Sequence, residues 1–237
     1  MLKEICFVLI FHAAVLQSAP SGDSHDIKKI LIIGGTGQAG SGMVREALSR
    51  GLHVRVMSRH ASKVPEDIRN KVKIITGDVQ NYQDVESAVK GVDAVIVAIS
   101  TNNYEDTSNY MTRGLQNVLK AMKAANVPLI NALLSDFVLM KTEDIPALYR
   151  NAVKDQHAMY DALKSSGLTY IASCPADFTH SPADGYIARN DVLPDATGDA
   201  NVISLNQLSK YFIDVLSQPV HYGHLVSVVN KGEVKKD

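Results

Sequence analysis

Short apolar runs alternate with stretches of mixed polarity along most of the chain. Seven runs are rich in isoleucine and valine, at residues 30–33, 54–57, 72–75, 94–99, 129–134, 170–174 and 225–229. Continuous apolar runs are typical of parallel strands whose two faces are both buried. The pattern therefore predicts seven strands in a parallel sheet.

The stretches between these runs predict helices. We place helices at residues 37–50, 81–89, 109–125 and 145–166, and one more that begins at Ser204. Ser204 and Gln207 have the spacing of a capping box. Strands that alternate with helices predict an α/β fold with a single domain and a doubly wound parallel sheet. The segment 180–200, rich in proline, glycine and aspartate, is interpreted as a surface loop.

The two ends of the chain differ from the rest. Residues 1–21 contain an apolar run, Ile5–Leu16, which is shorter than the roughly 20 residues of a membrane span. This run is typical of a signal peptide, with small residues at Ala19-Pro20-Ser21, but an irregular N-terminal extension explains it equally well. The protein is therefore either secreted or cytoplasmic. Residues 27–230 form the expected domain, and 231–237 a flexible tail.

Charge, cysteine content and histidine spacing limit the kinds of ligand and partner that we expect. The formal net charge of −1 provides no general attraction to nucleic acid or acidic membranes. Cys6 and Cys174 are the two cysteines, and loss of a leader would remove Cys6 and exclude an internal disulfide. His221 and His224 have no evident third ligand, so we expect no metal. We expect a small-molecule ligand, with no nucleic acid and no stable membrane span.

A glycine-rich segment follows the first predicted strand and opens the first predicted helix. It runs Gly34, Gly35, Thr36, Gly37, Gln38, Ala39, Gly40. Gly34 allows a sharp turn, Gly37 admits a pyrophosphate close to backbone amides, and Gly40 allows the helix to approach the strand. The helix N-terminus then offers unpaired donors to the phosphates. In this context the motif predicts a Rossmann-type dinucleotide site.

The residues after the second strand indicate which dinucleotide binds. An NAD site has an acidic residue there that accepts from the ribose 2′-hydroxyl. This chain has Arg59 and Lys63 instead, with no acidic residue before Glu66. A guanidinium matches the geometry of a 2′-phosphate. The predicted cofactor is NADPH.

Later strand ends supply further candidates for cofactor binding. Asp78 and Val79 follow the third strand, where they would contact the adenine, although Asp78 would equally cap the next helix. Ile99, Ser100 and Thr101 follow the fourth strand. Strand ends in this fold face the ligand crevice, so these residues are expected beneath the pyrophosphate and ribose.

Several motifs occur together in the order of a known family. They are the glycine segment, Arg59 with Lys63, Gly77-Asp-Val, Asp93-Ala-Val-Ile-Val, Leu119-Lys-Ala-Met-Lys-Ala, Ser135 with Phe137, Ser166-Gly-Leu-Thr-Tyr170 and Val202-Ile-Ser204. Over residues 28–230 the chain resembles the NADPH-dependent flavin reductase or biliverdin-IXβ reductase family, which are NmrA-like atypical short-chain dehydrogenases. The resemblance implies a monomer that transfers hydride from NADPH to flavins or linear tetrapyrroles.

The family's site residues carry over unevenly. Ser135 matches the active-site serine, and Phe137 matches an aromatic neighbour beside the cofactor. A family histidine falls on Gln156, and we take the adjacent His157 as the second catalytic candidate beside Ser135.

Three departures concern the substrate side. The family's alanine, second histidine and arginine correspond here to Asp136, Asp177 and Asn201. Lost positive charge and added carboxylates are expected to weaken binding of propionate-bearing tetrapyrroles and flavin phosphates.

Two alternative functions stay open. Tyr160 and Lys164 have the Tyr-x-x-x-Lys spacing of dehydrogenases and epimerases that transfer a proton through tyrosine. Because Lys164 directly precedes a strand, we expect both residues at the end of the helix away from the cofactor. The other alternative is a non-catalytic NADP(H) sensor, related to NmrA-like regulators, that binds partners through residues 180–200.

Overall fold

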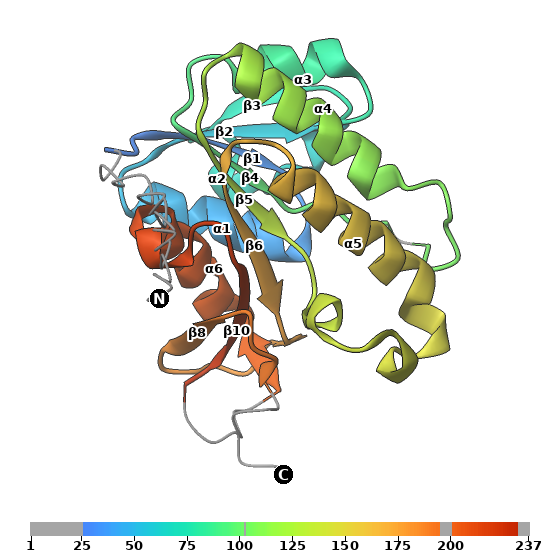
Figure 1. Ribbon diagram of the computed structural model, residues 1–237. Helices are drawn as coiled ribbons and strands as arrows, with labels where there is room; N and C mark the ends of the chain where they lie inside the picture. Colours follow the sequence, from blue (N-terminus) through green and yellow to red (C-terminus); the bar gives the residue numbers. More distant parts are fainter. Residues whose placement is uncertain (1–25, 102, 195–200, 232–237) are drawn as a thin grey trace, which may run out of the picture.

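The protein is a single α/β domain built on an eight-stranded sheet (Figure 1). The computed structural model describes residues 26–101, 103–194 and 201–231, so the expected leader and most of the tail lie outside the described residues. The strand order is β3-β2-β1-β4-β5-β6-β10-β8. All neighbouring strands are parallel except β10 and β8, which are antiparallel.

The seven predicted strands are confirmed, with ends that shift by one or two residues. They are β1 (Lys29–Ile33), β2 (His53–Ser58), β3 (Lys73–Thr76), β4 (Ala94–Val97), β5 (Leu129–Leu133), β6 (Thr169–Pro175) and β10 (Leu225–Asn230). Side chains alternate between the two faces, so Leu31 and Ile33 enter one core while Ile30 and Ile32 enter the other. Because both faces are buried, these strands carry apolar residues at consecutive positions.

Helices cover both faces of the sheet, as expected for a doubly wound fold. They are α1 (Gln38–Ser49), a short α2 (Glu66–Arg69), α3 (Tyr82–Val89), α4 (Tyr110–Ala124), α5 (Arg150–Lys164) and α6 (Leu205–Asp214). Helices α3, α4 and α5 form the core on one face, and α1 and α6 form it on the other (Figure 1). Among the described residues, no helix combines the length and the apolar character needed to cross a bilayer.

The interpretation of residues 180–200 as a loop is wrong in part. Strand β8 (Tyr186–Asn190) pairs with β10 at the sheet edge, and β7 (Asp177–Thr179) pairs with β9 (Val202–Ser204) in a separate two-stranded sheet. All residues of β8 are half-buried, so the strand lacks the apolar run that marks a central strand. Residues 195–200 lie outside the described part.

One predicted helix cap and one predicted helix start differ from the structure, although α6 begins directly after Ser204 as expected. The capping box is absent: Ser204 Oγ donates to Asn206 Oδ1 over 2.6 Å, and Gln207 Nε2 donates to the Ala183 carbonyl over 2.7 Å. The helix expected from residue 145 begins at Arg150 instead. Short 3-10 turns, η3 (Thr142–Asp144) and η4 (Ala147–Tyr149), precede it, because Pro146 interrupts the helical pattern.

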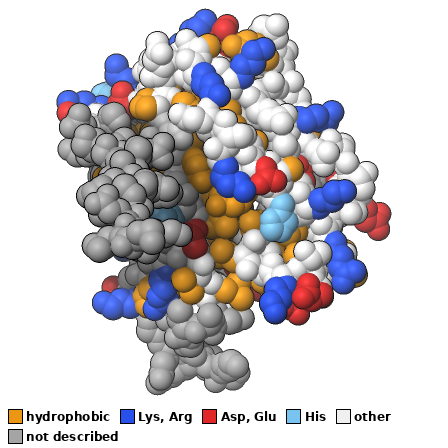
Figure 2. All heavy atoms as spheres, in the orientation of Figure 1, with side chains coloured by type: hydrophobic (Ala, Val, Ile, Leu, Met, Phe, Trp, Pro, Cys, Tyr) orange, Lys and Arg blue, Asp and Glu red, His pale blue; other side chains and the backbone are white. Residues whose placement is uncertain are grey.

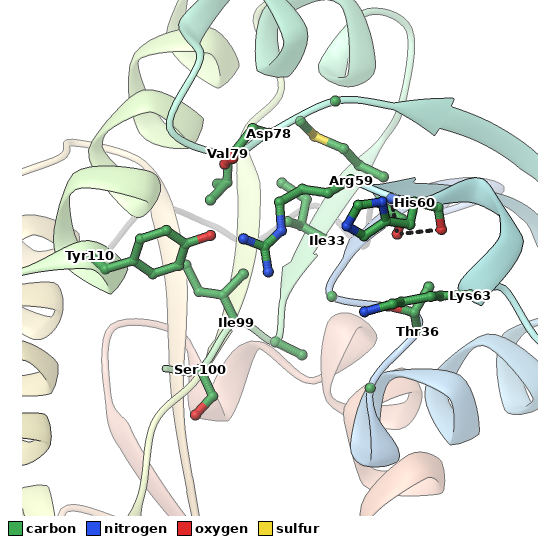
Figure 3. A pocket seen from close by; sticks show the side chains of 16 residues that line it. Ile33, Thr36, Arg59, His60, Lys63, Asp78, Val79, Ile99, Ser100 and Tyr110 are labelled. Carbon is green, nitrogen blue, oxygen red and sulfur yellow. Dashed lines mark hydrogen bonds between the residues drawn. The ribbon is translucent and has the colours of Figure 1, made fainter. Parts of the chain in front are cut away.

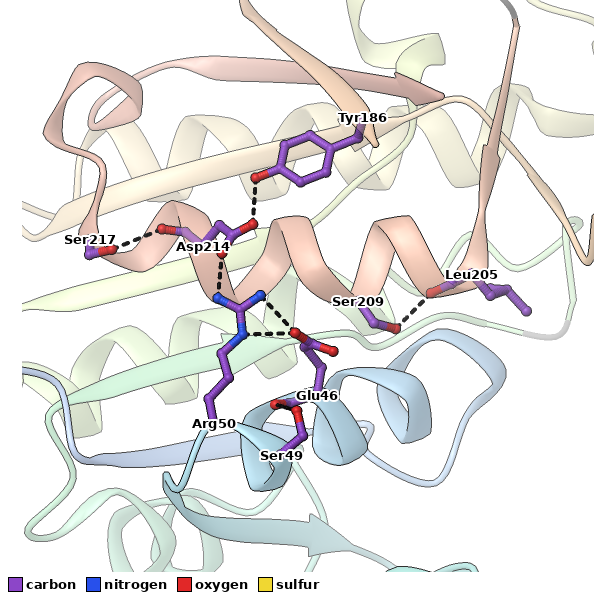
Figure 4. Close-up of polar contacts among 8 residues, drawn as sticks. All are labelled: Glu46, Ser49, Arg50, Tyr186, Leu205, Ser209, Asp214 and Ser217. Carbon is purple, nitrogen blue, oxygen red and sulfur yellow. Dashed lines mark hydrogen bonds and ion pairs between the residues drawn. The ribbon is translucent and has the colours of Figure 1, made fainter. Parts of the chain in front are cut away.

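A group of polar contacts joins α1, α6 and the edge strand β8 (Figure 4). Arg50, at the end of α1, pairs with Glu46 over 2.7 Å and with Asp214 of α6. Tyr186 of β8 donates to the other oxygen of Asp214 over 2.8 Å. Burial, followed by the nearby Asp214 carboxylate, raises the pKa of the Tyr186 hydroxyl well above its usual range. The Tyr186 hydroxyl therefore stays protonated and acts as a donor. Together these contacts join the edge strand β8 to α1 and α6.

A buried carboxylate holds α4 and α5 together. Asp155 of α5 accepts hydrogen bonds from the backbone amides of Met111 and Thr112 over 2.9 and 3.1 Å, and Thr112 Oγ1 also donates to it. These amides belong to the first turn of α4, whose donors otherwise lack partners. Asp155 therefore caps a neighbouring helix and sets how α5 lies against α4.

We expect Asp155→Asn to lower the free energy of unfolding by about 2 kcal/mol, because a buried amide accepts fewer hydrogen bonds than a carboxylate and leaves donors unpaired. Urea unfolding followed by circular dichroism measures the change. Asp161→Asn is the control on the same helix, where the carboxylate pairs with Lys164 at the surface, and it should change stability by less than about 0.5 kcal/mol. Equal effects of the two variants would contradict this role of Asp155.

Candidate active site

Two adjoining cavities open at the carboxyl ends of the parallel strands. The first has a volume of about 350 Å³ and the second of about 340 Å³. Ile99 and Ser100, directly after β4, line both cavities, so the two form one continuous site. The sheet order reverses between β1 and β4, and ligands of open α/β sheets bind at such a reversal.

Residues from the ends of β1, β2, β3 and β4 line the first cavity (Figure 3). They are Ile33, Gly34, Thr36, Gly37, Met57, Ser58, Arg59, His60, Lys63, Gly77, Asp78, Val79, Ala98, Ile99, Ser100 and Tyr110.

The glycine segment turns at Gly34 and packs tightly at Gly40. Gly34 has φ +87°, and a Cβ there would overlap the carbonyl group of Ala98. A Cβ on Gly40 would overlap the carbonyl oxygen of Gly34, so α1 approaches β1 as closely as glycine permits. Around Gly37 the nearest atom to an added Cβ is 3.4 Å away, and this residue faces the cavity. The roles expected for Gly34 and Gly40 agree with this geometry.

The N-terminus of α1 is suited to bind an anion. No side chain caps Gly37, and the first turn of α1 contains no acidic residue. The first amides of a helix lack intrahelical acceptors and lie at the positive end of its dipole. Phosphate oxygens supply the acceptors that these amides require. Beside this turn, Gln38 Nε2 lies 3.0 Å from His180 Nε2, which brings the segment after β7 next to the helix.

Two cationic side chains also line the first cavity. Arg59 follows β2 and points into the cavity, while Lys63, in the 3-10 turn η1 (Ala61–Lys63), approaches from the side of Thr36 (Figure 3). The backbone at Arg59 is held in a turn because Ser58 Oγ accepts from the His60 amide over 3.2 Å. Both cations are exposed, so a ligand in the cavity can reach them.

Tyr110 is a lining residue that the sequence analysis missed. Its ring extends from the start of α4 toward Arg59 across the cavity (Figure 3). Burial and the Asp78 carboxylate raise the pKa of its hydroxyl, against an opposing effect of Arg59. Tyr110 therefore stays protonated as a donor. A tyrosine at the start of a helix carries no distinctive sequence signal, whereas strand ends do, which explains the omission.

The second cavity is lined by apolar and aromatic side chains with two carboxylates. Its walls are Ile99, Ser100, Tyr104, Leu133, Leu134, Ser135, Asp136, Phe137, Tyr149, Ala152, Val153, Gln156, Pro175, Ala176, Asp177 and Phe178. Tyr149 stacks with Phe137 at 5.2 Å between ring centroids and meets the edge of Tyr104 at 5.1 Å. Figure 2 shows hydrophobic side chains gathered at the middle of this face, near the ends of β5 and β6.

Ser135, directly beyond β5, is oriented by Gln156 of α5. The backbone amide of Ser135 lies 3.0 Å from Gln156 Oε1, and its hydroxyl lies 2.7 Å from the same atom. A backbone N–H only donates, so the Gln156 atom that faces it is the oxygen, and the Ser135 hydroxyl donates to that oxygen as well. The remaining lone pairs of Ser135 Oγ are left to accept a hydrogen bond from a ligand.

The structure brings together most of the predicted site residues. Gly34, Thr36, Gly37, Arg59, Lys63, Asp78, Val79, Ile99 and Ser100 line the first cavity, while Ser135 and Phe137 line the second. Gln38, Ala39 and Gly40 form the first turn of α1 beside the first cavity. Thr101 and His157 line neither cavity. At the position matched by a family histidine, Gln156 and not His157 faces the site, because successive helical residues point in directions about 100° apart.

The pair Tyr160 and Lys164 lies outside both cavities. The Lys164 ammonium lies 4.6 Å from the centre of the Tyr160 ring, and the other neighbour of that ring is Tyr170, whose hydroxyl donates to the Gly223 carbonyl over 2.8 Å. Tyr170 and Gly223 lie at the opposite end of the sheet from the glycine segment, since Tyr170 is the second residue of β6. In this chain Tyr160 and Lys164 therefore pack against each other and against Tyr170, away from the two cavities.

Comparison with known proteins agrees with this geometry. Residues 34–219 match the family described as NAD(P)H-binding. The YwnB protein of Bacillus subtilis is 28% identical over 221 residues, which covers 86% of this chain and 100% of YwnB. A UDP-glucose 4-epimerase of Rickettsia conorii is 30% identical over 86% of this chain, but the matched part is only 60% of the epimerase.

Solved structures with the same fold include a candidate NADH-flavin reductase from Streptococcus pneumoniae. It is 21% identical, with a TM-score of 0.72, and the match covers 86% of this chain and 100% of that one. At this identity the likeness shows the fold alone. The family match covers the glycine segment, both cavities and the helices around them, and the chain therefore belongs to the NAD(P)H-binding family.

Proposed function

We propose that this protein is an NADPH-dependent reductase that transfers hydride to a flavin or a related conjugated acceptor such as a linear tetrapyrrole. The observation that carries the proposal is the continuity of the two cavities at Ile99 and Ser100. A cationic cavity with a helix N-terminus suits the adenosine and pyrophosphate half of a dinucleotide. The aromatic cavity beside it suits a nicotinamide together with a flat acceptor.

The residues of this chain would hold the dinucleotide at three places. The amides at the start of α1 would bind the pyrophosphate, and Arg59 with Lys63 would bind the adenosine 2′-phosphate. Ser135 Oγ would accept from the nicotinamide carboxamide, since its own proton is donated to Gln156 Oε1. When bound, NADPH supplies the hydride.

The acceptor would lie against the aromatic wall of Phe137 and Tyr149. Flavins and bilins accept hydride at a conjugated centre, so the main contribution of the protein is to hold donor and acceptor face to face. Solvent can supply the accompanying proton, because the second cavity is open beside Asp177 and Phe178, which are both exposed. No tyrosine–lysine pair is needed for this reaction. A 3-beta-hydroxysteroid dehydrogenase from Mycolicibacterium neoaurum is 31% identical over 51% of this chain and 35% of the dehydrogenase, so reduction of a carbonyl substrate is the alternative reaction.

NADPH oxidation with riboflavin, FMN and biliverdin as acceptors tests this function. We expect turnover of at least one acceptor by the full chain. Ser135→Ala should lower kcat/KM about tenfold, the value of one lost hydrogen bond, and Tyr160→Phe should leave it unchanged. Cofactor binding without turnover of any acceptor would contradict the reductase and favour the sensor. Loss of activity in Tyr160→Phe, with Ser135→Ala active, would favour a dehydrogenase or epimerase reaction.

The choice of NADPH depends on Arg59. We expect Arg59→Asp to reduce the ratio of kcat/KM for NADPH to that for NADH by about a hundredfold, because a carboxylate repels the 2′-phosphate and accepts from a 2′-hydroxyl. Steady-state kinetics with both cofactors measure this ratio. Lys71→Asp makes the same change of charge at an exposed position outside the cavity and should leave the ratio within about twofold. An unchanged ratio in Arg59→Asp would show that other residues bind the phosphate.

A further inference from the structure

The two cavities differ in the sign of their charged side chains. Arg59 and Lys63 line the first cavity, together with Asp78. Among the described residues, those that line the second cavity include two carboxylates, Asp136 and Asp177, and no lysine, arginine or histidine. Because the two cavities adjoin, a ligand that extends across both meets positive side chains in the first cavity and negative side chains in the second.

The two carboxylates come from different elements and face the same space. Asp136 begins the 3-10 turn η2 (Asp136–Leu139) after β5, and it is half-buried. Asp177 begins β7 and is exposed at the cavity opening. Burial, followed by the Asp136 and Asp191 carboxylates, raises the pKa of the nearby Cys174 thiol.

The remaining wall is built for a flat apolar ligand. Tyr104 is 45% exposed and Phe178 is 42% exposed, although both are large hydrophobic residues. Exposed apolar side chains that line a cavity are typical of a ligand-binding site. Together with Phe137 and Tyr149, these rings offer π-faces to a planar molecule.

We propose that the acceptor of this protein is a planar conjugated molecule without phosphate or carboxylate groups, either uncharged or cationic. The inference rests on the proposed reductase function and specifies its substrate class. Asp136 and Asp177 are the specificity-determining residues, because each repels an anionic substituent while the ring system itself is bound by aromatic contacts. The phosphates of the dinucleotide would bind in the first cavity, where Arg59 and Lys63 lie.

Riboflavin and FMN test the inference directly, because they share one ring system and differ in a phosphate. We expect the wild-type protein to favour riboflavin about tenfold in kcat/KM at low ionic strength, and salt to reduce this preference by screening. The double variant Asp136→Asn/Asp177→Asn should bring the two flavins within about twofold. The single variant Asp177→Asn, at an exposed position, should move the ratio in the same direction.

Asp184→Asn is the matched control. It also removes one exposed carboxylate, from a residue that lines neither cavity, and should leave the ratio unchanged. Equal or better use of FMN by the wild type, or a ratio that the double variant does not change, would overturn the inference.

A binding measurement separates this inference from the proposed function. If neither the flavins nor biliverdin are reduced, the reductase proposal fails, and quenching of flavin fluorescence by the NADP⁺-loaded protein then decides the inference alone. Tighter binding of riboflavin than of FMN supports it. Equal or tighter binding of FMN, or binding of neither flavin, overturns it.

Discussion

The close approach of α1 to β1 is the constraint on which the site depends. The backbone at Gly40 lies against the carbonyl group of Gly34, and Gly34 in turn lies against Ala98 of the neighbouring segment. A side chain at Gly40 would push α1 away from β1, and a side chain at Gly34 would clash with the backbone of Ala98. Because the contact is made, the uncapped N-terminus of α1 lies directly over the strand ends, where its amides face the first cavity. The close packing of α1 against β1 therefore places unpaired backbone donors at the cavity.

The topology of the sheet places the rest of the site around this contact. The order reverses between β1 and β4. The chain beyond β1, β2 and β3 lines one cavity, the chain beyond β5 and β6 lines the other, and the chain beyond β4 lines both. Helix α5 connects the second cavity to the core. Asp155 fixes α5 against α4, and the next residue, Gln156, orients Ser135. The residue that caps α4 and the residue that orients Ser135 are therefore neighbours on the same helix.

Much of this arrangement is predictable from local sequence patterns. Buried parallel strands carry continuous apolar runs, so seven strands and the doubly wound fold follow from the pattern, and the glycine segment with Arg59 identifies the cofactor side. Residues whose role depends on packing between distant elements are harder to find. Tyr110 and Gln156 reach the site from helices, and β8 is an edge strand with a weak apolar pattern. At Ser204, nearby Asn206 and Ala183 offer hydrogen-bond partners that compete with the expected capping box.

The central claim is that the helix N-terminus and Arg59 together bind a dinucleotide that carries a 2′-phosphate. Titration calorimetry of the wild-type chain with NADPH and with NADH measures this most directly. The account predicts binding of both at one site per chain, with NADPH tighter by about tenfold or more, as one charge-assisted bidentate contact provides. No heat of binding with either dinucleotide, or an equal affinity for the two, would contradict it.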